Sequence, residues 1–130
     1  MSRSLSYSSP RPTGGPELWS WVFMRLSGLV LLALALGHLV LMHLIHNVDT
    51  IDYNFVAGRY AGWGWRAYDG ALLILAMLHG LNGLRIILDD HLAHRAAHRW
   101  AIRGLYAVAA VFLLAGLYVV ICFQPAPSAR

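Results

Sequence analysis

Three long apolar stretches, separated by two polar segments, dominate the pattern of hydrophobic and polar positions along the chain. The first covers residues 18–45, and the others cover about residues 66–88 and 100–123. At a rise of about 1.5 Å per residue, each stretch is long enough as a helix to cross about 30 Å of hydrocarbon. The pattern therefore predicts an all-α membrane protein with three transmembrane helices.

The segments outside these helices define the domain organisation. Residues 1–17 are rich in Ser, Pro, Gly and Arg and have no apolar block, so we expect a flexible tail that is not a cleaved signal peptide. Residues 18–123 then form a single three-helix domain, and residues 124–130 form a C-terminal tail. The segment 46–64 is expected to be a loop with a short interfacial turn around residues 53–60.

Composition supports a membrane protein and excludes several other classes. Hydrophobic residues make up 58% of the chain and charged residues only 12%, against roughly 25% charged residues in soluble domains. The net charge is +4, but the arginines are spread over the tail, helix ends and loops and form no basic stripe, which excludes a nucleic-acid-binding fold. The single cysteine, Cys122, allows no disulfide framework and no cysteine metal site.

The distribution of arginines also predicts topology. More of them lie in the tail and the second loop than in the first loop and at the C-terminal end. By the positive-inside rule, the N-terminus is expected in the cytoplasm and the C-terminus outside.

Several polar residues fall inside the predicted spans, where an ionisable group at the centre costs about 2.5–3.5 kcal/mol on insertion scales. Such residues must face protein, water or a cofactor. For Asp69, the simplest expected partner is Arg66 or a polar group of another protein chain. The residues concerned are Arg25, His38, Asp69, His79, Asn82 and Arg85.

The two intramembrane histidines are the first candidates for cofactor ligation. His79 lies near mid-membrane, and Gly80 and Gly83 would let a flat porphyrin approach the helix. A histidine packed against a partner helix is the alternative. His38 is expected nearer the outer side, so the two should not ligate one iron. Either each would need a histidine from another protein chain, or only one of them is a ligand. His38 is therefore either a ligand, as an alternative to His79 or in addition to it, or structural.

One face of the second helix connects His79 to the cytoplasmic boundary. His79, Gly83, Ile86 and Asp90 share this face by helical spacing, with Asp90 at the boundary. The line of residues is expected to lead from a haem to the membrane surface.

A cluster of polar groups is expected at one level near the cytoplasmic side. Arg25 and Ser27 lie about 10–14 Å inside the boundary, at a level that Arg85 can reach. Guanidinium and hydroxyl groups at that depth suit haem propionates or a quinone carbonyl. The alternative is that both arginines extend to the lipid headgroups.

Three further histidines, His91, His94 and His98, have helical spacing beside Asp90. They could present a metal-binding face. A loop that contacts a peripheral partner or lipid phosphates is the alternative interpretation.

The order of several short motifs resembles that of a known family. The motifs are WVFMRLSG, GHL, DYNFV, LHGLNGLR and the acidic pair DD. In this order on three helices, they are similar to the hydrophobic membrane anchor of succinate:quinone oxidoreductase. Of the two anchors in the bacterial two-anchor form, the D-type anchor is the one that they resemble.

The resemblance implies partners, cofactors and a location. It implies a second membrane anchor of the C type, an iron–sulfur protein and a flavoprotein, with haem b between the two anchors. Electrons from succinate oxidation would reduce menaquinone or ubiquinone in the bacterial cytoplasmic membrane. The succinate site would lie outside this chain, which would be a membrane component of the enzyme.

The resemblance also implies residue roles. His79 matches the haem histidine, Asp90 matches the acidic residue near the quinone, and Arg25 and Ser27 match the R-x-S-G motif. The residue after the aspartate is usually Tyr in the family and is His91 here, and an imidazole can also donate a hydrogen bond.

In members with two haems, His38 would serve the distal haem. Two other hypotheses stay open: a haem b component of another quinone-linked oxidoreductase, and a structural membrane protein without a cofactor.

Overall fold

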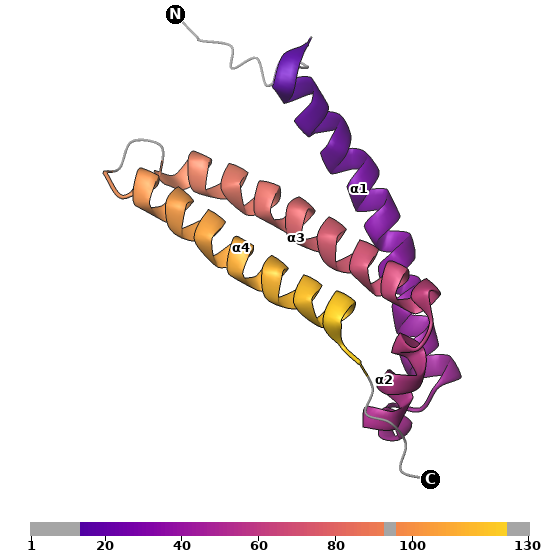
Figure 1. The fold of residues 1–130 in the computed structure, drawn as a ribbon. Helices are drawn as coiled ribbons and strands as arrows, with labels where there is room; N and C mark the ends of the chain where they lie inside the picture. Colours follow the sequence, from indigo (N-terminus) through magenta and orange to yellow (C-terminus); the bar gives the residue numbers. More distant parts are fainter. Residues whose placement is uncertain (1–13, 93–95, 125–130) are drawn as a thin grey trace, which may run out of the picture.

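Three long helices form the body of the protein in the computed structural model, which describes residues 14–92 and 96–124 (Figure 1). They are α1 (Gly15–Leu39), α3 (Trp63–Leu92) and α4 (His98–Cys122). A π-helix of six residues, Val40–Ile45, continues α1 directly. The three helices give spans long and apolar enough to cross a membrane, which confirms the all-α membrane fold.

The ends of the helices differ from the boundaries expected from polarity. α3 has 30 residues and extends beyond both ends of the predicted range 66–88. Its backbone hydrogen bonds continue past the apolar stretch, because a helix does not need to stop where hydrocarbon gives way to headgroups. Asp89 and Asp90, just beyond the predicted end at residue 88, are therefore helical.

The connection between the first two spans contains a short helix where the sequence predicted a loop with an interfacial turn. α2 (Tyr53–Tyr60) begins after Asp52, whose carboxylate accepts a hydrogen bond from the Phe55 backbone N–H at 2.8 Å. This is N-capping of the usual kind. A 3₁₀ turn, Val48–Thr50, precedes it.

α3 is the central helix, because it contacts both α1 and α4 (Figure 1). α4 lies along α3, whereas α1 crosses α3 near the end of the bundle where α2 lies. Small residues allow close approach: a Cβ added at Gly116 on α4 would lie 2.7 Å from Leu73 Cδ2 on α3. Such small residues are common where membrane helices pack.

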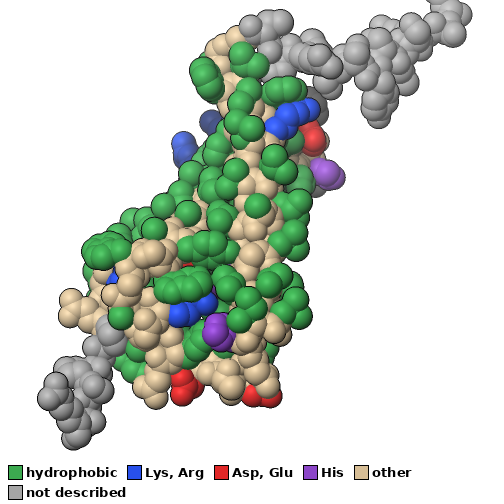
Figure 2. Space-filling model, turned by 90° about the vertical axis from the view of Figure 1, so that its right-hand side faces the viewer, with side chains coloured by type: hydrophobic (Ala, Val, Ile, Leu, Met, Phe, Trp, Pro, Cys, Tyr) green, Lys and Arg blue, Asp and Glu red, His purple; other side chains and the backbone are tan. Residues whose placement is uncertain are grey.

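The protein buries very little apolar surface within itself. Among the described residues, Ala57 has the one buried hydrophobic side chain, Gly70 is also buried, and Ser27 and Arg59 are buried polar residues. Figure 2 shows apolar side chains over most of one face, with charged groups gathered toward its two ends. This exposed apolar surface suits lipid tails and other membrane proteins as its surroundings.

Arg66 joins three elements at one end of the bundle. Its Nε donates to the Tyr60 carbonyl at 2.7 Å, and Nη1 donates to the Val120 carbonyl at 2.6 Å. Nη2 donates to the Phe123 carbonyl at 2.6 Å. The last carbonyls of a helix have no partner within the helix, so this guanidinium caps α4 and ties it to α2 and α3.

We expect Arg66→Met to lower the free energy of unfolding by about 2 kcal/mol, because hydrogen bonds from a charged donor are lost at a helix end. Thermal unfolding of the purified protein would measure the change. Arg103→Met is the control, since Arg103 is exposed and its guanidinium lies 5.4 Å from the Trp100 ring. Equal stability of the two variants would contradict a capping role for Arg66.

Candidate functional site

His79 is held where α3 meets α1. Its Nδ1 is 2.8 Å from the hydroxyl oxygen of Ser27, which is only 4% exposed. A Cβ added at the next residue, Gly28, would lie 3.2 Å from Cε1 of the His79 ring. The ring therefore rests against the α1 backbone, and among the described residues its Nε2 has no hydrogen-bond partner.

His38 lies at a different level, as the sequence predicted. Its Nδ1 is 3.8 Å from Asp69 Oδ1, and its ring is parallel to that of Tyr68, with centroids 6.4 Å apart. On α1, the step from Gly28 to His38 corresponds to about 15 Å along the helix axis. His38 and His79 of one chain therefore do not ligate a single iron atom together.

The carboxylate of Asp69 has a partner other than the one expected. Asp69 Oδ1 is 3.8 Å from Arg59 Nη2, and both side chains are largely buried. The expected pairing with Arg66 is wrong, because the Arg66 guanidinium is used by backbone carbonyls of α2 and α4. Burial raises the pKa of Tyr60 in α2, and the nearby Asp69 carboxylate raises it further.

Arg59 is buried between aromatic rings at the same end of the bundle. It is 8% exposed, and its guanidinium carbon lies 3.7 Å from the centroid of the Trp65 ring. Its Nη1 donates to Met42 Sδ at 3.2 Å, which connects α2 to the π-helix. Three buried polar atoms of this cluster have no hydrogen-bond partner among residues 14–92 and 96–124: Arg59 Nη2, Asp69 Oδ1 and His38 Nδ1. At separations of 3.8 Å these groups attract one another without forming a direct hydrogen bond.

The two arginines expected beside a cofactor have different surroundings. Arg25 is exposed, and its guanidinium carbon lies 3.5 Å from the centroid of the Trp21 ring. This is a cation–π contact one helical turn away. Arg85 Nε is buried and has no hydrogen-bond partner within the described part of the chain. A Cβ added at Gly83 of α3 would be 3.9 Å from Met24 Cε of α1. Gly83 therefore faces α1, the helix that also contacts His79.

The C-terminal end of α3 presents Asp90 and His91 as exposed residues. His91 Nδ1 is 2.9 Å from the Ile87 carbonyl, which can only accept, so Nδ1 has the proton in this contact. His98 Nε2 is 2.7 Å from Asp89 Oδ1. His94 lies outside the described residues, and among those described no group of three metal-ligating side chains comes together.

Asn82 has a defined environment that the sequence did not reveal. Its Nδ2 donates to Ser20 Oγ at 3.2 Å, across from α3 to α1. Both residues line a cavity of about 320 Å³ that also contacts α4 through Tyr106. Helical wheel positions alone could not have shown this cavity, because it depends on how three helices pack.

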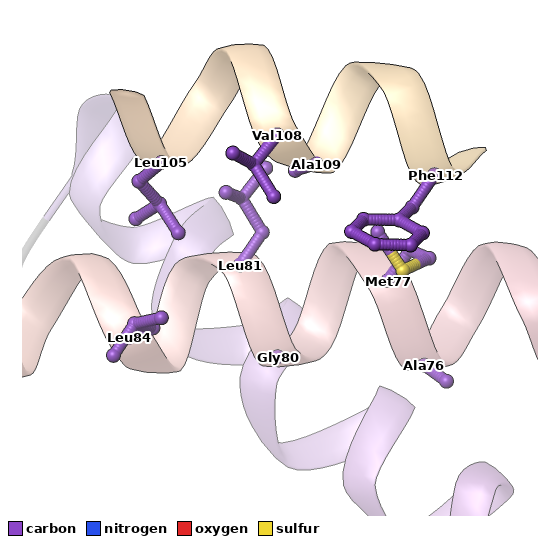
Figure 3. Close-up of a pocket in the computed structure, with 9 residues that line it drawn as sticks. All are labelled: Ala76, Met77, Gly80, Leu81, Leu84, Leu105, Val108, Ala109 and Phe112. Atoms are coloured by element: carbon purple, nitrogen blue, oxygen red, sulfur yellow. The ribbon is translucent and has the colours of Figure 1, made fainter. Parts of the chain in front are cut away.

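Gly80 was expected to make room for a porphyrin beside His79, but it faces a different space. It lines a cavity of about 320 Å³ between α3 and α4 (Figure 3). The walls are apolar, with Leu105, Val108 and Phe112 on the α4 side. This cavity lies on another face of α3 from the contact between His79 and Ser27.

Comparisons with known proteins define the class. A sequence profile described as succinate dehydrogenase/fumarate reductase transmembrane subunit matches residues 2–119. The chain belongs to this family of membrane anchors. It is also 32% identical over 101 residues to the succinate dehydrogenase 2 membrane subunit SdhC of Mycobacterium tuberculosis, covering 78% of this chain and 72% of the relative.

The family confirms the resemblance found in the sequence at the level of a succinate dehydrogenase membrane anchor. The mycobacterial relative is named SdhC, whereas the motifs resembled the D-type anchor. The choice between the two anchor types therefore stays a prediction. With three apolar spans, the chain is a multi-pass membrane component of an oxidoreductase family.

We expect Asp69→Asn and Arg59→Gln each to destabilise the complex by about 3–5 kcal/mol, because each leaves one buried polar partner alone. The double variant should lose less than the sum of the two, since the coupled groups are removed together. Thermal unfolding of the purified complex would measure all three. Single variants as stable as the wild type would show that the pair contributes nothing to stability.

Proposed function

We propose that this chain is a haem-ligating anchor of succinate:quinone oxidoreductase, which passes electrons from an iron–sulfur protein to quinone. The observation that supports this most directly is the position of His79. Its Nδ1 is hydrogen-bonded to Ser27 inside the protein, and its Nε2 has no hydrogen-bond partner among the described residues. A histidine held in this way is suited to bind a metal.

The protein groups around His79 fit a haem. An imidazole ligates iron through an unprotonated nitrogen, and an Nδ1–H that donates to Ser27 leaves Nε2 unprotonated. Arg85 lies six residues further along the same helix, and its Nε is buried without a hydrogen-bond partner among the described residues, which suits the carboxylate of a propionate. When bound, haem b would supply one-electron redox chemistry, while the protein sets its ligation and surroundings.

The small amount of buried apolar surface supports the proposed partners. A second membrane anchor, of the C type if this chain is the D-type anchor, would cover exposed apolar faces and supply a further histidine for the haem. The iron–sulfur protein and the flavoprotein would dock on the cytoplasmic side of a bacterial cytoplasmic membrane. The family assignment favours this complex over a haem b component of another quinone-linked enzyme.

His38 is proposed as the ligand of a second haem in a complex that contains two. The carboxylate of Asp69 near its Nδ1 resembles the groups that orient metal-ligating histidines. The stacked Tyr68 ring would restrict the imidazole further.

We expect His79→Ala to remove haem b from the purified complex, because no other described histidine lies at that level of the bundle. The haem-to-flavin ratio, from a pyridine haemochrome assay, measures the result. His38→Ala is the matched control and should keep this haem, while removing a second haem if the complex has one. Wild-type haem content and a low-spin spectrum in His79→Ala would make His79 structural.

The quinone end is proposed near Asp90 and His91. Ser27 is less suited to contact the quinone than the sequence suggested, because it is 4% exposed and its hydroxyl bonds to His79. His91 uses Nδ1–H on the Ile87 carbonyl, so its Nε2 can donate to a quinone oxygen only when the ring is protonated. A protonated His91 beside Asp90 could therefore deliver a proton to the reduced quinone.

We expect Asp90→Asn to lower quinone reduction at least about tenfold, equivalent to roughly 1.4 kcal/mol of barrier, because the charge that supports proton delivery is lost. Succinate oxidation with a water-soluble acceptor should stay intact, since it bypasses the membrane site. Asp89→Asn is the control, because Asp89 is paired with His98 and should leave quinone reduction unchanged. If Asp90→Asn keeps both activities, the quinone site lies elsewhere; if both activities fall together, Asp90 supports docking of the soluble partners.

A further inference from the structure

The contact between Ser27 and His79 is more closely constrained than a chance contact between two helices. Ser27 is 4% exposed, and its Oγ lies 2.8 Å from Nδ1. The adjacent Gly28 keeps the α1 backbone close to the ring, since a Cβ there would be 3.2 Å from Cε1. Two adjacent residues of α1 thus fix both the orientation and the distance of one imidazole on α3.

The direction of the hydrogen bond determines which nitrogen is free to bind a metal. In a neutral imidazole one nitrogen has the proton and the other has the lone pair. If Ser27 accepts from Nδ1–H, the lone pair is on Nε2. If the serine hydroxyl donated to Nδ1 instead, Nε2 would have the proton and could not ligate iron.

We propose that Ser27 is a positioning residue for the haem ligand His79: its hydroxyl oxygen accepts from Nδ1–H, selects the tautomer that ligates through Nε2, and increases the electron donation of that nitrogen. This inference rests on the proposed haem ligation. It gives Ser27 a role different from the quinone contact expected from the sequence. Groups that hydrogen-bond to a ligating histidine fix its ring and raise its basicity.

The expected effect of removing the hydroxyl follows from the electron donation of Nε2 to the iron. A more basic imidazole stabilises the oxidised iron more than the reduced iron. Removing the hydroxyl lowers the basicity of the imidazole and should therefore favour reduction. Loss of the partner of a ligating histidine typically lowers metal affinity about 10- to 100-fold. Ser27→Ala should therefore bind haem more weakly and hold it at a more positive midpoint potential.

The experiment compares three variants in the purified complex. The readouts are the haem-to-flavin ratio, the midpoint potential of the haem and the g values of the oxidised low-spin haem. For Ser27→Ala we expect up to about a tenfold rise in the equilibrium constant for reduction, which is about 59 mV for a one-electron couple. Ser27→Thr keeps the hydroxyl and should restore both the potential and the g values.

Ser20→Ala is the matched control, because Ser20 is another α1 serine whose hydroxyl bonds to an α3 side chain, Asn82. It should leave the haem potential at the wild-type value. If Ser27→Ala does not assemble, Ser27→Cys is measured in its place, since it keeps the side-chain size but accepts only weakly. Ser27→Cys should show a smaller shift in the same direction.

The outcomes separate this inference from the proposed function. Wild-type potential and g values in Ser27→Ala or Ser27→Cys, or an equal shift in Ser20→Ala, would overturn the role of Ser27. The haem ligation would still stand if His79→Ala loses the haem. A wild-type complex without haem, or a His79→Ala complex that retains it, would instead overturn the proposed function on which this inference rests.

Discussion

In a bilayer interior no water is present to hydrogen-bond polar side chains, so each of them needs a partner within the protein. Apolar contacts alone fix the register of membrane helices poorly, because lipid tails are as apolar as leucine. The polar contacts of α1 with α3 are more selective. Ser27 with His79 and His38 beside Asp69 lie at two levels, and together they fix how far α1 is shifted along α3.

The two levels differ in whether a polar group remains available to a ligand. At the level of Asp69, the guanidinium of Arg59 is enclosed by Trp65, Met42 and the Asp69 carboxylate, so its charge is directed inward to the protein. At the level of His79, one side of the imidazole is fixed and Nε2 is left without a protein partner among the described residues. The first arrangement suits the joining of α2 to the bundle, and the second suits the binding of a metal supplied from outside the chain.

Much of the fold followed from the sequence, because its signals are local. Apolar length predicted the three spans, and Asp52 before Tyr53 is a capping signal for α2. The separation of His38 and His79 followed from helical rise. The spacing of Trp21 and Arg25, one helical turn apart, also indicates their contact, although the contact was not predicted. In contrast, the partners of Ser27, Arg66 and Asp69 lie far along the chain or depend on packing between elements, and no local pattern defines that register.

The amount of buried surface indicates how the site would be completed. A chain that buries one hydrophobic side chain among those described cannot form a closed cofactor pocket alone. In the proposed complex, a flat haem would need apolar groups on both faces, and among the described residues His79 is the one histidine at its level. A second anchor would then supply the remaining contacts. It would stabilise the haem and the fold through the same surface, so that haem loss and separation of the anchors should be thermodynamically coupled.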